Sequence, residues 1–317
     1  MKNTHPKILF IGTPEFAIPA LEALMNSECE VVAVLTQPDK PAGRKHLLQA
    51  PPVKIFAQKH GLPVLQPSSL KEAKIVDVLI QYSPDLAVVV AYGKIIPPSV
   101  LRIPKYGMLN IHPSLLPQYR GPSPVASAIM HGETNTGVSI MLLDSEMDHG
   151  PLLTQASLHI PPDAMLEDMH TQLFTLGASI LPRTLFKYLS GDLKPQEQDH
   201  TQATYCTMLK REDGMIHVSK TAHEVYNQYR GLTPWPGVYF FWNKKRIKIL
   251  QACAVGAQAL HELRRSFNTP QNSDDNLFVS SHKLYMMMCD APLQLLVVQP
   301  EGKKALSAIE FIAGYMK

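Results

Sequence analysis

The sequence predicts an α/β protein, with a doubly wound, mostly parallel sheet in its N-terminal domain and a small C-terminal β-barrel (OB-like) domain. In the first half, short β-branched runs alternate with helix-like segments, which is the pattern of parallel strands joined by crossover helices. Beyond residue 207, short β-prone runs are separated by polar or proline-containing stretches, as in small antiparallel barrels. A chain of 317 residues is long enough for two such domains.

The strands of the first domain are the apolar runs at residues 8–11, 31–36, 86–91, 108–111 and 138–143. Helices are expected at 19–26, 53–60, 71–82, 124–131 and 164–189, the last one kinked or divided at Pro182. The first helix starts at Pro19 because proline is tolerated at the first helical position. Residues 13–17 then form a turn at the carboxyl end of the first strand, where open α/β sheets bind ligands.

The second half contains β-prone runs at 238–242, 247–250, 284–288 and 293–298. The stretch before them, 191–207, is polar and lacks apolar periodicity, so we interpret it as a linker between domains at 1–190 and 208–317. Residues 208–317 carry 14 Lys and Arg against 9 Asp and Glu, a net charge of +5 in a chain whose total is +3. Any surface for nucleic acid is therefore expected on the second domain.

Composition argues against several classes of protein. The four cysteines are far apart and show no metal-ligand spacing, so we expect neither a disulfide framework nor a metal site. The apolar run at 8–11 is too short for a signal peptide or a membrane span. The sequence predicts a cytoplasmic protein that does not enter a membrane. The Gly12-Thr13-Pro14 turn lacks the GxGxxG pattern, which argues against a nicotinamide enzyme.

Asn110 and His112 are the first candidates for chemistry. They stand two residues apart at the end of a β-prone run, so their side chains are expected on one face of the sheet. An amide that binds a developing oxyanion and an imidazole that moves protons suit acyl transfer. By itself an NxH pattern is weak, and an ordinary strand end with a loop histidine fits it as well.

A second polar segment follows the strand at 138–143. The loop at 144–150 contains Asp144, Glu146 and Asp148, and a carboxylate brought near His112 would hold its tautomer and favour its protonated form. Without further information, such an acidic loop is more often a solvated turn.

An ordered set of motifs resembles the methionyl-tRNA formyltransferase family. The set spans nearly the whole chain, and each motif alone is modest. Its members are FIGTPEFA at 10–17, TQPDKPAGR at 36–44, AYG at 91–93, NIHPSLLPQYRG at 110–121, MDHG at 147–150 and GLTPWPG at 231–237.

The resemblance implies a folate-binding catalytic domain at 1–190 and a barrel-like domain at 208–317 that contacts tRNA. The donor would be 10-formyltetrahydrofolate and the acceptor the methionyl initiator tRNA, with no metal and no obligate protein partner. Arg44 matches an arginine that reaches the acceptor end of tRNA, although the Lys45-His46-Leu47 sequence after it is less basic than the family pattern. The other implied site residues are Asn110, His112 and Asp148 for catalysis, and Ser114, Leu115, Leu116 and Pro117 for contact with tetrahydrofolate.

Two other functions remain open on the sequence. A formyltransferase that acts on an amino sugar or another small amine would share the same three catalytic residues. It would need neither the loop at 37–44 nor a basic second domain. A non-catalytic protein that binds folate or tRNA would not need the intact Asn, His and Asp set.

Overall fold

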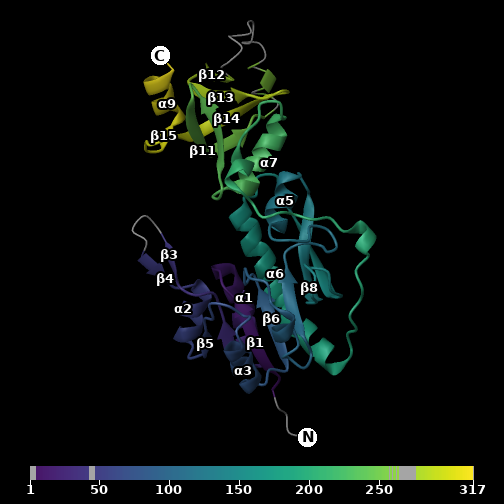
Figure 1. Cartoon of the computed structure of the whole chain (residues 1–317). Coiled ribbons are helices and arrows are strands. Elements are labelled where there is room, and N and C mark those ends of the chain that lie inside the picture. Colours follow the sequence, from purple (N-terminus) through teal and green to yellow (C-terminus); the bar gives the residue numbers. More distant parts are fainter. Residues whose placement is uncertain are drawn as a thin grey trace. The chain divides into compact units, whose positions relative to one another are not determined.

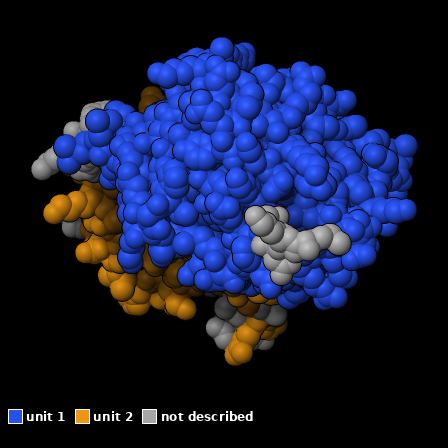
Figure 2. All heavy atoms as spheres, turned by 90° about the horizontal axis from the view of Figure 1, so that it is seen from below, with its two compact units in different colours: residues 1–124, 135–159, 167–206 blue, residues 125–134, 160–166, 207–317 orange. Residues whose placement is uncertain are grey.

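The computed structural model describes the chain in several ranges, residues 5–42, 47–256, 258, 260, 261, 263 and 276–316. The chain forms two compact units, which Figure 2 distinguishes by colour. Unit 1 comprises residues 1–124, 135–159 and 167–206, and unit 2 comprises 125–134, 160–166 and 207–317. In the ranges that the structure describes, no helix is long and apolar enough to cross a membrane.

Unit 1 is built on a seven-stranded sheet with the order β5-β2-β1-β6-β7-β8-β9 (Figure 1). The strands are β1 Lys7–Gly12, β2 Glu30–Leu35, β5 Val64–Leu65, β6 Leu86–Val90, β7 Met108–His112, β8 Asn135–Leu142 and β9 Leu152–His159. Pairing is parallel from β5 to β7, while β8 is antiparallel to both β7 and β9. The mostly parallel sheet that the sequence predicts is confirmed.

The expectation of parallel pairing for residues 138–143 is wrong. Strand β8 runs antiparallel to β7. The short loop 143–151 that joins β8 to β9 also makes that pair antiparallel, because a parallel pair needs a longer crossover. Strand β9 was not expected. Its residues alternate between half-buried and exposed, so it lacks the continuous apolar run that indicates an inner strand.

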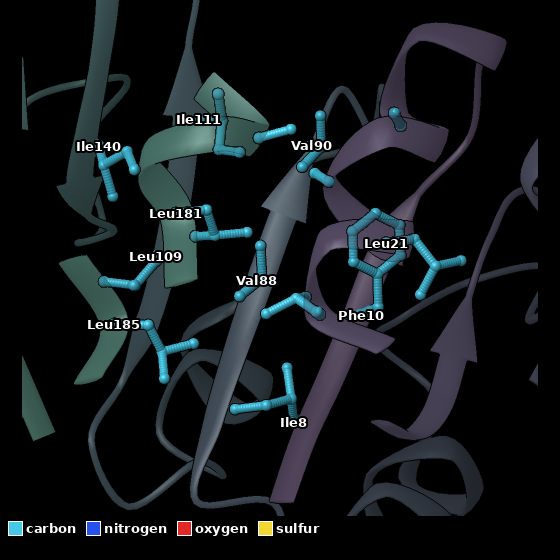
Figure 3. Close-up of a cluster of buried hydrophobic side chains, with 14 of the residues drawn as sticks. Ile8, Phe10, Leu21, Val88, Val90, Leu109, Ile111, Ile140, Leu181 and Leu185 are labelled. Atoms are coloured by element: carbon cyan, nitrogen blue, oxygen red, sulfur yellow. The ribbon is translucent and has the colours of Figure 1, made fainter. Parts of the chain in front are cut away.

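Helices cover both faces of this sheet. On one face lie α1 Ile18–Met25, α2 Pro52–Lys59 and α6 Leu166–Ser190, and on the other α3 Ala73–Gln81 and α4 Pro98–Leu101. Figure 3 shows the first of these two cores, where Phe10, Val88 and Ile111 of the sheet lie near Leu21 and Leu181 of the helices.

The structure differs from the predicted helices at the start of α1 and at Pro182 of α6. A 3-10 turn at Glu15–Ala17 precedes α1, which begins one residue before Pro19, so the proline still lies in the first turn. Helix α6 is continuous through Pro182, and not divided there.

A short hairpin formed by β3 Lys40–Ala42 and β4 Leu47–Gln49 extends from the chain after β2. The base of this hairpin is held by a polar cluster. Lys54 forms an ion pair with Asp39 at 2.8 Å, and Gln66 donates a hydrogen bond to the same carboxylate at 2.7 Å. These bonds hold the pKa of Asp39 below its usual value, chiefly through Lys54. Residues 43–46, between β3 and β4 in the sequence, lie outside the described residues.

Unit 2 contains an antiparallel sheet with the order β10-β11-β14-β13-β12, and β15 pairs with β14. This confirms the small antiparallel domain expected after the parallel one. The strands are β10 Val238–Trp242, β11 Lys245–Ala254, β12 Leu277–Ser280, β13 Lys283–Met287, β14 Pro292–Pro300 and β15 Leu306–Ser307.

Three helices of this part of the chain are α5 Pro124–Met130, α7 Ala222–Leu232 and α9 Ala308–Tyr315. Helices α7 and α9 were not expected. Both begin with a capping box, formed by Thr221 with Glu224 and by Ser307 with Glu310. This Ser/Thr-x-x-Glu pattern is legible in the sequence and would have located both starts. Short 3-10 turns lie at His200–Gln202 and Arg211–Gly214.

Candidate active site

Strand β7 brings Asn110 and His112 to the carboxyl end of the parallel sheet. The neighbours Leu109 and Ile111 face the core beneath α6, so Asn110 and His112 point to the opposite side of the strand. His112 is only 4% exposed, whereas Asn110 is half-buried. Within the described ranges, the Asn110 amide has no hydrogen-bond partner, which leaves its N–H groups available to a ligand.

Asp148 lies beside His112, as a carboxylate of the loop 143–151. Its Oδ1 is 3.6 Å from Nδ1 of His112, and its Oδ2 accepts a hydrogen bond of 2.8 Å from the backbone N–H of Gly121. The backbone of Asp148 has φ of +50°, which is uncommon outside glycine. Residues of this kind are enriched in functional sites, because the surroundings must hold the unfavourable conformation.

The contacts of His112 identify Nε2 as a ring nitrogen that carries a proton. Its Nε2 lies 3.0 Å from the carbonyl oxygen of Tyr119, and a carbonyl can only accept, so this nitrogen carries a proton. The other ring nitrogen, Nδ1, faces the Asp148 carboxylate.

The loop 114–117 is held by hydrogen bonds from two side chains, Ser139 of β8 and Gln155 of β9. Ser139 Oγ donates to the Ser114 carbonyl at 2.6 Å and accepts from the Leu116 N–H at 3.0 Å. Gln155 donates to the Leu116 carbonyl at 2.8 Å. Ser114 and Leu116 are buried, so their side chains brace the loop, while Leu115 and Pro117 remain half-buried. A carbonyl accepts two hydrogen bonds, so the braced carbonyls can still bind donors of a flat ring.

A second polar cluster occupies the same edge of the sheet, after β1, β2 and β6. The carbonyl of Tyr92 accepts hydrogen bonds from Thr13 Oγ1 at 3.1 Å and from Gln37 Nε2 at 2.6 Å. Gly93 has φ of +76°, and a Cβ there would lie 2.6 Å from Gln37 Nε2, so another residue would be strained and would displace the Gln37 amide. Burial raises the pKa of Tyr92 to about 12, which keeps its hydroxyl neutral. This cluster ties together the loops that follow β1, β2 and β6.

The structure separates the two aspartates of the acidic loop. Asp144 is bonded to His149 at 2.7 Å and accepts from the Glu146 N–H at 2.8 Å, so it is occupied away from His112. Only Asp148 is placed against the imidazole. Arg44 lies outside the described residues. In the part of the chain that the structure describes, no group of three or more His, Cys, Asp or Glu side chains could hold a metal ion.

Sequence reasoning missed Arg120 and Gln198, which are both buried near Asp148. Gln198 lies in the stretch 191–207 that we interpreted as a linker, and it donates to the carbonyl of Asp148 at 3.0 Å and of Gly150 at 2.7 Å. A polar stretch without periodicity gives no sign that one of its members is buried. Arg120 stands inside the NIHPSLLPQYRG motif, and that position was the available signal.

Comparison with known families gives two matches that together cover most of the chain. Residues 6–185 match the formyl transferase family, and residues 208–316 match the formyl transferase C-terminal domain. A methionyl-tRNA formyltransferase from Chloroflexus aurantiacus is 46% identical over 308 residues, which cover 97% of this chain and 96% of the relative. One from Geobacter sulfurreducens is 40% identical over 309 residues, with 98% and 94% covered.

Solved structures share the fold at low sequence identity. The sugar 3N-formyl transferase WlaRD, solved in the presence of dTDP and 5-N-formyl-THF, superposes with a TM-score of 0.64 at 16% identity and covers 95% of this chain and 100% of its own. HypX from Aquifex aeolicus in complex with tetrahydrofolic acid gives a TM-score of 0.64 at 15% identity over 99% of this chain. The chain spans 48% of the length of HypX.

Proposed function

The chain belongs to the methionyl-tRNA formyltransferase family, and we propose that it transfers the formyl group of 10-formyltetrahydrofolate to the α-amine of the methionyl initiator tRNA. The observation that carries this proposal is the identity of 46% to a methionyl-tRNA formyltransferase along 97% of the chain. The product would be N-formylmethionyl-tRNA, which links one-carbon metabolism to the initiation of translation. Well-separated cysteines fit a cytoplasmic location for this reaction.

Asn110, His112 and Asp148 are the catalytic residues of this proposal. When bound, 10-formyltetrahydrofolate supplies a formyl carbon that is activated toward an amine. The Asn110 amide donates to the formyl oxygen as negative charge develops there. His112 exchanges its bond to the Tyr119 carbonyl for one to the substrate, and Asp148 stabilises the positive charge on the ring.

Formyl transfer also requires a proton to pass from the attacking amine to the folate nitrogen that leaves. The attacking amine forms a bond to the formyl carbon and loses a proton, while the bond from that carbon to the folate nitrogen breaks and the nitrogen gains a proton. His112 is the group placed to move this proton, because its Nε2 donates to the Tyr119 carbonyl and its Nδ1 faces the Asp148 carboxylate.

The loop 114–117 is the proposed contact for the folate ring. Its residues are Ser114, Leu115, Leu116 and Pro117. Support for this role comes from the bracing by Ser139 and Gln155, which fixes the loop while each braced carbonyl keeps one free lone pair. The half-buried side chains of Leu115 and Pro117 then give apolar contact, and Ser114 and Leu116 act through their backbone.

We assign residues 1–190 to folate binding and catalysis, and residues 208–317 to tRNA contact. The net charge of +5 in the second range supports that division, because phosphate contacts dominate binding to nucleic acids. Arg44 is proposed to contact the acceptor end of the tRNA on the strength of the sequence resemblance.

The decisive experiment measures transfer of a labelled formyl group to charged initiator tRNA, free methionine and an amino sugar nucleotide. We expect efficient transfer to the tRNA alone. Preferred transfer to the amino sugar would instead make the protein a small-amine formyltransferase. Binding of folate and tRNA without any transfer would make it a non-catalytic binding protein.

A further inference from the structure

Arg120 is a buried cation that has no acidic partner in the described part of the chain. Its side chain is 1% exposed, and among the described residues no carboxylate forms an ion pair with it. Its N–H groups are met by neutral acceptors, namely Gln198 Oε1 at 3.1 and 2.7 Å, His200 Nδ1 at 2.8 Å and the Tyr205 hydroxyl at 3.3 Å. Burying a guanidinium that is bonded only to uncharged acceptors costs folding free energy. We therefore expect Arg120 to have a role other than stabilising the fold.

The Gln198 side chain links the Arg120 guanidinium to the loop of Asp148 by hydrogen bonds. Its Oε1 accepts two hydrogen bonds from the guanidinium, which fixes the orientation of the amide. The Nε2 of the same amide then faces the carbonyls of Asp148 and Gly150 at 3.0 and 2.7 Å. With the amide turned over, neither set of bonds could form. The backbone on both sides of His149 is thus held by one side chain.

Arg120 also stands between the two backbone groups that contact the catalytic pair. The preceding carbonyl, of Tyr119, accepts from His112, and the following N–H, of Gly121, donates to the Asp148 carboxylate. The backbone of Arg120 is itself bonded to the segment 204–206, since it donates to Thr204 at 2.9 Å and accepts from Cys206 at 2.8 Å. The residue that carries the guanidinium is therefore held by the same backbone segment that contacts His112 and Asp148.

We propose that Arg120 and Gln198 form a buried clamp that positions the Asp148 carboxylate toward Nδ1 of His112. Both are positioning residues, because neither touches the reacting atoms. The clamp explains how Asp148 keeps its left-handed backbone, which the surroundings must hold. It rests on the proposed function, in that Asp148 must be a catalytic carboxylate for its position to matter.

Gln198→Glu tests the clamp with little disturbance of Arg120. The new carboxylate still accepts from the guanidinium, but it has no N–H to donate to the carbonyls of Asp148 and Gly150. We expect kcat to fall by about ten- to a hundredfold, since small errors in positioning cost that much, while KM for both substrates and the melting temperature stay close to wild type. Gln58→Glu is the matched control, because Gln58 is exposed on α2 and gains the same charge.

A double-mutant cycle separates positioning from a general structural role. If Gln198 acts through the Asp148 carboxylate, Gln198→Glu should cost less than about threefold in an Asp148→Asn background. Equal losses in both backgrounds, or an unchanged kcat in Gln198→Glu, would overturn the clamp. Gln198→Met takes the place of Gln198→Glu in the same cycle if the charged variant does not fold. Wild-type activity of Asp148→Asn would instead remove the catalytic assignment itself.

Discussion

Oδ1 of Asp148 lies 3.6 Å from Nδ1 of His112, and both side chains are largely buried. This distance is longer than a hydrogen bond, yet it is well within the range in which a carboxylate stabilises a neighbouring imidazolium. The pair is therefore arranged to gain strength when the ring carries charge, which is the condition expected during proton transfer.

Replacing Asp148 should affect the reaction far more than replacing Asp144. Asp148→Asn removes the charge beside His112, and loss of a group acting in acid–base chemistry typically lowers kcat by about 10² to 10⁴. Asp144→Asn should be mild, because the amide oxygen can still accept from the Glu146 N–H, the amide N–H can donate to Nδ1 of His149 in its other tautomer, and neither contact involves His112. Steady-state kinetics and a folate-binding titration check this. Equal losses in the two variants would contradict the assignment.

His112→Ala and Asn110→Ala should each lower kcat much more than they raise KM for either substrate. The proposed interactions strengthen as charge develops in the transition state, so their loss leaves ground-state binding nearly intact. Varying folate at saturating tRNA, and the reverse, separates kcat from KM. A rise in KM with normal turnover would make these residues binding groups.

The sequence predicted the strand that carries Asn110 and His112 because its apolar run is continuous and ends at polar residues. It could not predict β9, whose half-exposed alternation resembles a surface segment. The support of Asp148 by Gln198 was equally hidden, since 50 residues separate the two positions and no local pattern links them. Contacts of that kind depend on how loops return to the sheet, which periodicity does not encode.

His170 should make the folded state less stable in acid. It lies in α6 with its ring stacked on Phe16 and near Phe174, and burial lowers its pKa from 6.5 to about 4. Because the unfolded chain binds a proton in this range and the folded one does not, stability is lost as the pH falls from about 6.5 toward 4.

His170→Gln should reduce the loss of unfolding free energy between pH 7 and pH 4 by on the order of 3 kcal/mol, which is the free-energy equivalent of the shift in the pKa of His170. Urea unfolding of unit 1 between pH 7 and 4, followed by a spectroscopic probe, measures it. His159→Gln changes an exposed histidine and serves as control. The same acid dependence in both variants would assign the effect to another group.

Arg44→Leu should reduce formylation of initiator tRNA more than formylation of a minimal aminoacyl substrate. The base of its hairpin is anchored by Asp39, Lys54 and Gln66, so the substitution should leave the fold and folate binding unchanged. The ratio of kcat/KM on the two substrates is the measurement. Equal losses on both would argue that Arg44 does not contact tRNA.

Lys244 and Lys245 should contribute phosphate contacts that do not depend on tRNA sequence. Both are exposed, Lys244 in the turn after β10 and Lys245 as the first residue of β11, whereas the adjacent Arg246 is paired with Glu301 at 3.3 Å and lies over the ring of Tyr239. The two lysines are thus the freer charges of this turn, and their reversal to glutamate leaves that pair in place.

In the double variant, binding of cognate and noncognate tRNA should weaken alike. Each lost phosphate contact should also reduce the slope of log affinity against log salt by about 0.7 to 0.9, because fewer counterions are released. Salt titrations of tRNA binding measure this, with Lys71→Glu and Lys74→Glu as an equal charge change at exposed positions of unit 1. Deletion of residues 208–317 should remove most of the salt-dependent affinity while folate binding persists. Unchanged tRNA affinity in both proteins would argue that tRNA binds elsewhere, because a basic surface that releases no counterions holds no phosphate.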